Sequence, residues 1–357
     1  MVKLPGQPGG RRTPPPSRPS GAGTTAPQLL DRSARAVALQ PEWLPHSFSA
    51  DGKQIASVFV PRAEHDKLTF LNDHYFANRF AVALHDRVEV EALAAAAPEG
   101  PLHFIFHTGF CCSTLLAKAL TVPGRSWGLK EPVILNDLAL QDAQPDRLRL
   151  MLRLLARPFD EGATVIAKAS NVANKLVAPV LDSSPSSRAI LLSSDLRSTL
   201  LSVAKQGLDR RIWVRQLYLA LSKWTSIGIA GGLPDAAELP DLPLAALAWF
   251  MQVEHFRHIA RRYGGNRVLL LDGAALLERP AETLAKVSSF LDLGFDRATI
   301  RAIVDGPAFH THSKRIGAPY DSGVRESELS AARRSHGPEI DATVRWLERV
   351  TRGAVAA

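Results

Sequence analysis

The sequence has very little cysteine. Only two cysteines occur among 357 residues, and they are neighbours, Cys111 and Cys112. Adjacent cysteines cannot connect distant segments, which excludes a disulfide framework and fits a reducing compartment, so we expect a cytoplasmic protein. A closed zinc site needs about four ligands, usually as spaced pairs, and no Cys-x-x-Cys motif is present. We expect no metal.

Long apolar runs are also missing. No segment approaches the roughly 20 apolar residues that span a bilayer, and the first residues contain no apolar stretch typical of a secretory signal. We therefore expect no membrane partner. Residues 1–28 are rich in Pro, Gly, Ser and Arg and predict a disordered tail. Residues 29–98 then predict a small N-terminal α/β extension, and residues 99–357 the main domain.

The remaining composition is that of a globular protein with a basic balance. Hydrophobic residues make up 46% of the chain, which is enough for a sizeable core, and the net charge is +8. A positive balance suits an anionic ligand or nucleic acid. Neither a zinc finger nor a basic strand interleaved with aromatics is present, so we expect no nucleic-acid partner. The oligomeric state stays open.

The main domain alternates apolar and helical segments. Four apolar segments are each followed by a helical pattern: Leu102–His107, Ala163–Ser170, Ser187–Ser194 and Asn266–Gly273. This alternation predicts an α/β fold with three layers and a central parallel sheet. Residues 212–263 predict helices that are interrupted at 228–243. In the extension, Ile55–Pro61 predicts a strand and Leu68–Arg79 a helix.

The segment from Phe104 to Leu120 has the layout of a phosphate-binding strand, loop and helix. It reads FIFHTGFCCSTLLAKAL, so the strand ends near Gly109 and the helix begins near Ser113. Such a turn presents free N–H groups and the positive end of the helix dipole to an anion, and Ser113 and Thr114 add hydroxyl donors. An ordinary turn with a Ser or Thr cap is the alternative.

Two common catalytic loops do not fit this segment. A Walker A loop that starts at Gly109 needs Gly-Lys where the chain has Thr114-Leu115, which argues against a Mg-ATP enzyme. A cysteine phosphatase needs Arg six residues after the cysteine, where the chain has Ala117 or Lys118. A reactive thiol at the helix start and small buried packing residues both remain open.

Together these residues resemble the sulfotransferases that use 3′-phosphoadenosine 5′-phosphosulfate (PAPS). Their phosphosulfate loop often reads T-x-R-S-G-S-T-x-L, and this chain matches it at four positions. Leu129–Pro132 (LKEP), the segment RAILLSSDLRSTLLSVAKQG, and NRVLLLDGAALLERPAETLAKVSSFLDL resemble later family segments in order and spacing. The matching loop positions are Thr108, Ser113, Thr114 and Leu116.

The resemblance implies a P-loop domain of sulfotransferase type with PAPS as co-substrate and a small-molecule or glycan acceptor. It implies that the loop holds the 5′-phosphosulfate, that Ser202 contacts the 3′-phosphate, and that Lys314 and Arg315 belong to a basic loop over the nucleotide. The implied phosphosulfate residues are Thr108, Gly109, Phe110, Cys111, Cys112, Ser113 and Thr114.

The chain departs from the family pattern where positive charge is expected. Phe110 replaces the basic loop residue, Cys112 replaces a glycine, and Ser194 stands where an arginine is expected eight residues before Ser202. Arg197, three positions further on, is our candidate to bind the 3′-phosphate in its place.

Another cation must serve the sulfuryl group if the enzyme is active. Lys168 ends a predicted strand, and the carboxyl ends of neighbouring parallel strands converge, so we expect its ammonium to point at the loop. Lys130 and Lys314 are the alternatives.

Sulfuryl transfer also needs a base for the acceptor. Glu131 is the first choice, because a glutamate serves as the base in the equivalent segment of some sulfotransferases, and we expect Lys130 to keep it ionised. His107 is the second choice. A non-catalytic or altered nucleotide-binding relative, or a P-loop phosphotransferase, remains the alternative function.

Overall fold

A computed structural model describes residues 30–65, 67–76, 79–141, 144–225, 229, 232–311 and 322–352. The predicted tail at residues 1–28 and the candidates Lys314 and Arg315 lie outside these ranges.

The main domain is built on a five-stranded sheet in which every pairing is parallel. The spatial order is β5-β6-β4-β7-β8, so β5 and β6 lie on one side of β4, and the later strands β7 and β8 lie on the other. The carboxyl end of β4 is therefore the point where such sheets usually bind ligands. The strands are β4 (Leu102–His107), β5 (Ser126–Lys130), β6 (Thr164–Lys168), β7 (Ala189–Ser193) and β8 (Val268–Asp272).

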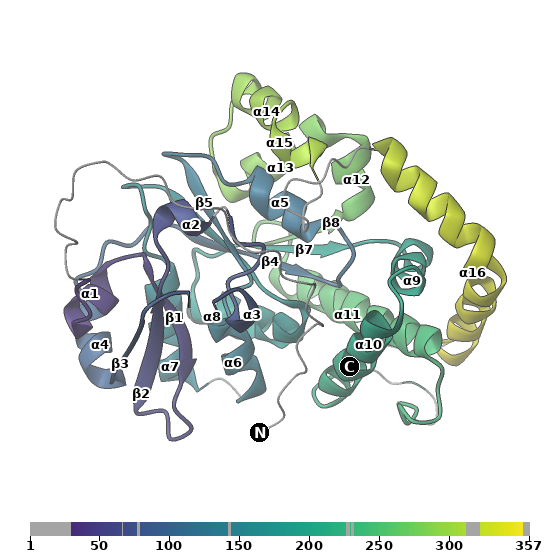
Figure 1. Ribbon diagram of the computed structural model, residues 1–357, viewed down its shortest axis with the longest axis horizontal. Coiled ribbons are helices and arrows are strands. Elements are labelled where there is room, and N and C mark those ends of the chain that lie inside the picture. The colour runs from purple at the N-terminus through teal and green to yellow at the C-terminus, as the bar shows by residue number, and fades with distance from the viewer. Residues whose placement is uncertain are drawn as a thin grey trace, which may run out of the picture.

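Helices cover both faces of this sheet, which confirms the predicted three-layer α/β fold (Figure 1). One face carries α5 (Ser113–Ala119), α12 (Gly273–Glu278), α13 (Pro280–Leu291), α14 (Arg297–Val304) and α15 (Pro307–His310). The other carries α6 (Ile134–Leu140), α7 (Pro145–Leu155), the 3-10 helix η1 (Asn171–Leu176), α8 (Val177–Ser183) and α11 (Asp241–Tyr263).

Strand β4 shows why the sheet needs a layer of helices on each face. Phe104 and Phe106 belong to the apolar cluster on one face, whereas Ile105 belongs to the cluster on the other. Successive side chains of a strand point to opposite faces, so an all-apolar strand is stable only between two layers. All three side chains are fully buried, and each contributes about 1.5–3 kcal/mol.

A separate helical group stands beside the β7–β8 side of the sheet (Figure 1). It has an apolar cluster of its own and approaches the carboxyl end of β4 through Phe110 and Trp213. Its helices are α9 (Leu196–Ala204), α10 (Leu208–Ser222), α11 and α16 (Ser322–Val350). None of the described helices is long and apolar enough to cross a bilayer.

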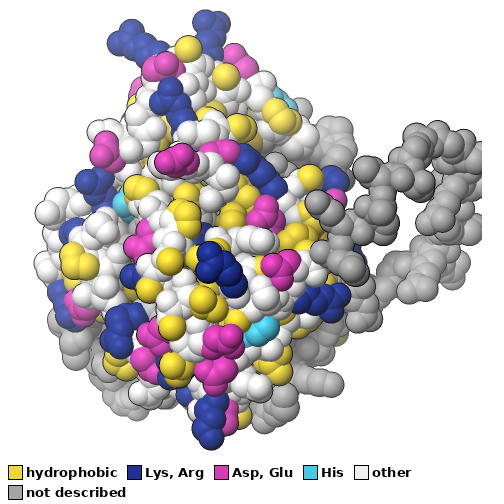
Figure 2. Space-filling view, turned by 90° about the vertical axis from the view of Figure 1, so that its left-hand side faces the viewer, with side chains coloured by type: hydrophobic (Ala, Val, Ile, Leu, Met, Phe, Trp, Pro, Cys, Tyr) yellow, Lys and Arg dark blue, Asp and Glu magenta, His cyan; other side chains and the backbone are white. Residues whose placement is uncertain are grey.

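The N-terminal extension is an antiparallel sheet in the order β1-β2-β3, with helices beside it (Figure 1). Its apolar residues form one continuous cluster with those of the main sheet, so the two regions share a core. On its outer side, acidic and basic side chains are interspersed (Figure 2). The elements are α1 (Ala34–Leu39), β1 (Trp43–Phe48), β2 (Gln54–Phe59), α2 (Arg62–His65), α3 (Asp73–Phe76), β3 (Val82–Asp86) and α4 (Arg87–Ala94).

The predicted helix at Leu68–Arg79 is wrong over most of its length, because only Asp73–Phe76 forms a helical turn. Backbone hydrogen bonds to the β5 side explain the difference. The Leu71 N–H donates to the Lys130 carbonyl at 2.7 Å, and the Leu71 carbonyl accepts from Val133 N–H at 3.2 Å. These groups are then not available for helical i to i−4 bonds. The segment is thereby held at the edge of the candidate site.

Candidate active site

The loop after β4 has an unusual backbone. Gly109 has φ 87°, Phe110 has φ 54° and Cys112 has φ 63°. Side chains with a Cβ disfavour this left-handed region, and such residues cluster where a ligand is held. Of the four non-glycine residues with positive φ in the described chain, Phe110, Cys112 and Glu131 lie at this one site. A backbone that alternates between helical hands can turn successive N–H groups into an anion-binding concavity.

Neighbouring strand ends hold the loop in place. The Gly109 N–H donates to His107 Nδ1 at 3.0 Å, and the Ser194 hydroxyl lies 3.5 Å from the Phe110 carbonyl. At the end of β8, a Cβ on Gly273 would lie 2.5 Å from the Cys111 carbonyl oxygen, so only glycine fits there. The loop conformation is therefore fixed by its surroundings.

Glu131 and Lys168 form an ion pair beside the loop. Lys168 ends β6 and Glu131 follows the neighbouring strand β5, where its N–H donates to the Lys168 carbonyl at 2.7 Å. The Lys168 ammonium donates to Glu131 Oε1. The Lys168 side chain is 0% exposed and that of Glu131 is 17% exposed. The Phe70 ring centroid lies 5.3 Å from Lys168 Nζ.

The charges around Glu131 decide its ionisation. Burial raises the pKa of this carboxyl, but the Lys168 ammonium and His107 outweigh burial and lower the pKa to about 2. Glu131 is therefore ionised at neutral pH. It is also a weak base for as long as Lys168 holds it.

His107 faces the same carboxylate. Its Nε2 lies 3.7 Å from Glu131 Oε1, and its Nδ1 accepts the Gly109 N–H. In the neutral ring the proton must then reside on Nε2, on the Glu131 side. The Nε2–H is therefore on the side of Glu131, but at 3.7 Å the contact is longer than a hydrogen bond.

We expected Lys130 to keep Glu131 ionised, but its ammonium lies elsewhere. Its ammonium is buried and donates to the His65 carbonyl at 2.6 Å. Neighbouring residues at the end of a strand project to opposite sides, so Lys130 supports the extension while Glu131 faces the loop. Lys168 is the lysine that keeps Glu131 ionised.

Two buried polar atoms at the loop lack a hydrogen-bond partner within the described chain. They are Thr114 Oγ1 in α5 and Asn171 Nδ2 in η1, and both side chains are buried. The Asn171 amide nitrogen lies 3.4 Å from the position that a Cβ on Gly109 would occupy. Buried polar groups usually have partners, so such atoms mark a place where a ligand or water completes the set. Ser113, also buried, begins α5.

The two cysteines differ in their surroundings. Cys111 is fully buried in the apolar cluster around α5, and Cys112 lies at its edge. Neither forms a disulfide. The packing interpretation accounts for Cys111.

The candidate 3′-phosphate residues lie along α9. Arg197 is exposed and forms an ion pair with Asp341 of α16. The Ser202 hydroxyl donates to the Ser198 carbonyl at 2.8 Å, and Asp195 caps the helix. Contact of Arg197 and Ser202 with a phosphate stays a prediction.

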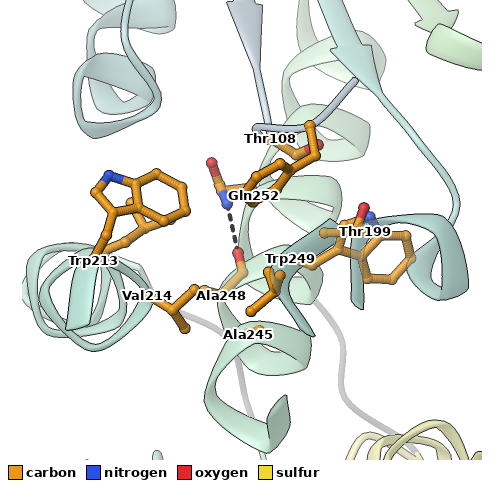
Figure 3. A pocket seen from close by; sticks show the side chains of 11 residues that line it. Thr108, Thr199, Trp213, Val214, Ala245, Ala248, Trp249 and Gln252 are labelled. Atoms are coloured by element: carbon orange, nitrogen blue, oxygen red, sulfur yellow. Dashed lines mark hydrogen bonds between the residues drawn. The ribbon is translucent and has the colours of Figure 1, made fainter. Parts of the chain in front are cut away.

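A small cavity lies beneath the loop, between α9, α10 and α11 (Figure 3). Its volume is about 10 Å³, which is roughly the space for one water molecule. The lining includes Thr108, Phe110, Trp213, Trp249 and Gln252. This cavity borders only Thr108 and Phe110 of the loop, so anion binding by the N–H groups of the loop stays a prediction.

Several residues at the site were not found by sequence reasoning. Asn174 donates to the His107 carbonyl at 3.0 Å and to Gln252 Oε1 at 2.9 Å, which fixes the end of β4. Arg210 and Trp213 of α10 lie against Phe110. They come from segments that carry no recognisable motif, so only the fold brings them to the loop.

No protein-family model matches this sequence, and no curated protein matches it either. Solved structures similar to it include the sulfotransferase domain from the curacin biosynthetic pathway, with 13% identity, 67% of this chain and 98% of that chain covered, and a TM-score of 0.39. The sulfotransferase STF9 from Mycobacterium avium has 12% identity, coverage of 70% and 78%, and a TM-score of 0.41. Mouse sulfotransferase SULT7A1 complexed with PAP has 11% identity, coverage of 70% and 88%, and a TM-score of 0.32. At these identities and TM-scores the likeness decides neither family nor reaction, so function must be argued from the residues.

Proposed function

We propose that this protein transfers a sulfuryl group from PAPS to a hydroxyl or amine of a small molecule or glycan. The observation that carries the proposal is the Glu131–Lys168 ion pair, which lies beside the loop after β4 with its left-handed backbone residues. It places an ionised carboxylate and a buried cation beside a turn whose backbone conformation suits an anion. Two of the segments that resemble those of PAPS-dependent sulfotransferases, the loop and Leu129–Pro132, lie at this site, whereas Lys168 lies outside the resembling segments.

The loop and α5 account for donor binding. Helix α5 begins at Ser113, and the first N–H groups of a helix have no partner within it. These groups, the Thr114 hydroxyl and the Asn171 amide are donors suited to phosphate and sulfate oxygens. Arg197 and Ser202 are the proposed contacts of the 3′-phosphate, and Lys314 and Arg315 are proposed to belong to a basic loop over the nucleotide.

The transfer step needs a base and charge neutralisation. The acceptor oxygen or nitrogen attacks sulfur, and its proton passes to the Glu131 carboxylate. As the new bond forms, the bond from sulfur to the phosphate oxygen breaks, and adenosine 3′,5′-bisphosphate leaves with the electron pair. Positioned cations stabilise the charge that develops on the moving group.

Lys168 connects donor binding to the strength of the base. In the absence of donor its ammonium contacts Glu131 and holds the pKa of that carboxyl at about 2. Sulfuryl oxygens beside the ammonium compete for the same charge. The pKa of Glu131 then rises toward its ordinary value, and the carboxylate becomes a better base when donor is bound.

A nucleotide-binding relative without transferase activity is the second candidate. Two observations favour it: Phe110 occupies the position of a loop cation, and Arg197 is already paired with Asp341. A P-loop phosphotransferase is less well supported, since Leu115 stands where its lysine belongs.

A transfer assay separates these functions. Purified protein is incubated with PAPS and a panel of phenol, alcohol, amine and glycan acceptors, and release of adenosine 3′,5′-bisphosphate is followed together with the sulfated product. We expect acceptor-dependent release that Glu131→Gln abolishes. Tight bisphosphate binding without release supports the non-catalytic relative, and consumption of ATP instead of PAPS supports the phosphotransferase.

A further inference from the structure

Arg210 on α10 lies against the loop. Its guanidinium carbon is 5.3 Å from the Phe110 ring centroid and 5.1 Å from that of Trp213. The two rings meet edge to face, with centroids 5.7 Å apart. A planar guanidinium interacts well with aromatic rings, and a lysine ammonium cannot reproduce that stacking. Phe110, which stands where a loop cation is expected, therefore holds a cation that comes from another helix.

The guanidinium still has hydrogen-bonding capacity. Its Nε donates to Gln206 Oε1 at 3.0 Å, and the remaining four N–H groups have no acceptor among the described residues. Burial lowers the pKa of Arg210, while Asp209 and Glu131 attract its charge and counteract burial. Arginine stays charged at neutral pH. The Glu131 carboxylate is thus one of the charges that act on Arg210.

The loop itself provides no positive charge that could balance a bound sulfuryl group. Residues 108–117 contain no Lys or Arg, and the charge of Lys168 is compensated by Glu131. The sulfuryl group and its bridging phosphate bring negative charge that this neutral pair does not balance. A further cation beside the loop is needed, and Arg210 is held there by two rings.

We propose that Arg210 supplies the positive charge that the loop lacks at Phe110, and that it contacts the oxygens of the sulfuryl group during transfer. This inference rests on the proposed function. It makes Arg210 a catalytic residue, with Phe110 and Trp213 as positioning residues that hold the guanidinium.

The test compares Arg210→Ala with Arg211→Ala. Arg211 is the next residue on α10 but points to Asp241, with Nη1 3.8 Å from the carboxylate. We expect Arg210→Ala to lower kcat by about 10²-fold, as the loss of one transition-state donor does. The Kd for adenosine 3′,5′-bisphosphate, which has no sulfuryl group, should change by less than about threefold. Arg210→Lys should fall between Arg210→Ala and wild type, and Arg211→Ala should match wild type.

The outcomes separate this inference from the proposed function. An active wild type with an equally active Arg210→Ala variant overturns the role of Arg210 alone. An equal loss of kcat/KM and bisphosphate affinity also overturns it, because Arg210 then binds the nucleotide rather than the moving group. A wild type that neither binds bisphosphate nor releases it from PAPS overturns both. Thermal unfolding checks each variant, and Arg210→Gln carries the comparison if the alanine variant unfolds.

Discussion

The ion pair of Glu131 and Lys168 is the residue-scale feature on which the account depends. Lys168 is fully buried, and its contact with Glu131 holds the carboxyl pKa at about 2. Because the folded-state pKa lies below the ordinary value of 4.5, the pair stabilises the protein above about pH 4.5. That contribution is lost as the pH falls toward 2.

A double-mutant cycle measures this pair. Lys168→Met leaves a buried carboxylate without its cation and should lower the free energy of unfolding at pH 7 by about 3–5 kcal/mol. Adding Glu131→Gln should recover part of that loss, since the uncompensated charge is removed. Lys286→Met, an exposed lysine on α13, is the matched control and should change stability by less than about 0.5 kcal/mol. Denaturant unfolding supplies the free energies of unfolding. If the effects of the two single substitutions simply add up in the double variant, the two residues do not interact, and the ion pair is contradicted.

In the transfer assay, Lys168→Met should abolish turnover and have a smaller effect on bisphosphate affinity. The reason is that Lys168 is proposed to act on the sulfuryl group rather than on the nucleotide phosphates. A fully active Lys168→Met variant would assign this role to another cation.

At the scale of elements, the sequence predicted the strands that carry the site and missed one that completes it. Strands β6, β4 and β7 are neighbours, as expected, so His107, Lys168 and Ser194 lie at one edge of the sheet. Strand β5 was missed because SWGLK is short and contains a glycine and a lysine, although all five residues are buried. Glu131 was proposed from the resemblance, but its partner Lys168 becomes evident only from the β5–β6 pairing. Arg210 was missed because α10 reaches the loop through tertiary packing alone.

The contact between α9 and α16 tests the proposed 3′-phosphate site. Arg197→Ala should raise the Kd for adenosine 3′,5′-bisphosphate about tenfold, because a charge-assisted hydrogen bond contributes about 1.5–3 kcal/mol. Asp341→Ala should leave that Kd unchanged or lower it, because Arg197 is released from its ion pair. Arg334→Ala on the same helix α16 is the control, since the Arg334 guanidinium donates to the Ser330 hydroxyl within that helix. Calorimetry gives each Kd, and an unchanged value for Arg197→Ala removes this residue from the site.

At the scale of the whole molecule, histidines whose pKa is lowered by burial make the fold sensitive to mild acid. Burial is the main cause that lowers the pKa of His65, His103 and His255, each from 6.5 to about 4. Between these values the unfolded chain binds more protons than the folded one, so stability falls as the pH decreases. Each histidine contributes a slope of up to about 1.4 kcal/mol per pH unit.

The free energy of unfolding should therefore decrease steeply from about pH 6.5 to 4. His65→Phe should reduce the slope by up to about 1.4 kcal/mol per pH unit, because phenylalanine cannot take up a proton and the site already contacts the rings of Trp127 and Phe159. His310→Gln, at an exposed position on α15, should leave the slope unchanged. Denaturant unfolding at several pH values gives the slopes, and a flat profile for wild type would contradict this interpretation.

The central claim is that the loop after β4 binds the nucleotide of a sulfuryl donor. Calorimetric titration of the full chain with adenosine 3′,5′-bisphosphate, with ATP as the comparison ligand, tests it most directly. The account predicts one bisphosphate per chain with a micromolar Kd and weaker binding of ATP. Absence of bisphosphate binding at millimolar ligand, from a protein that unfolds cooperatively, would contradict it.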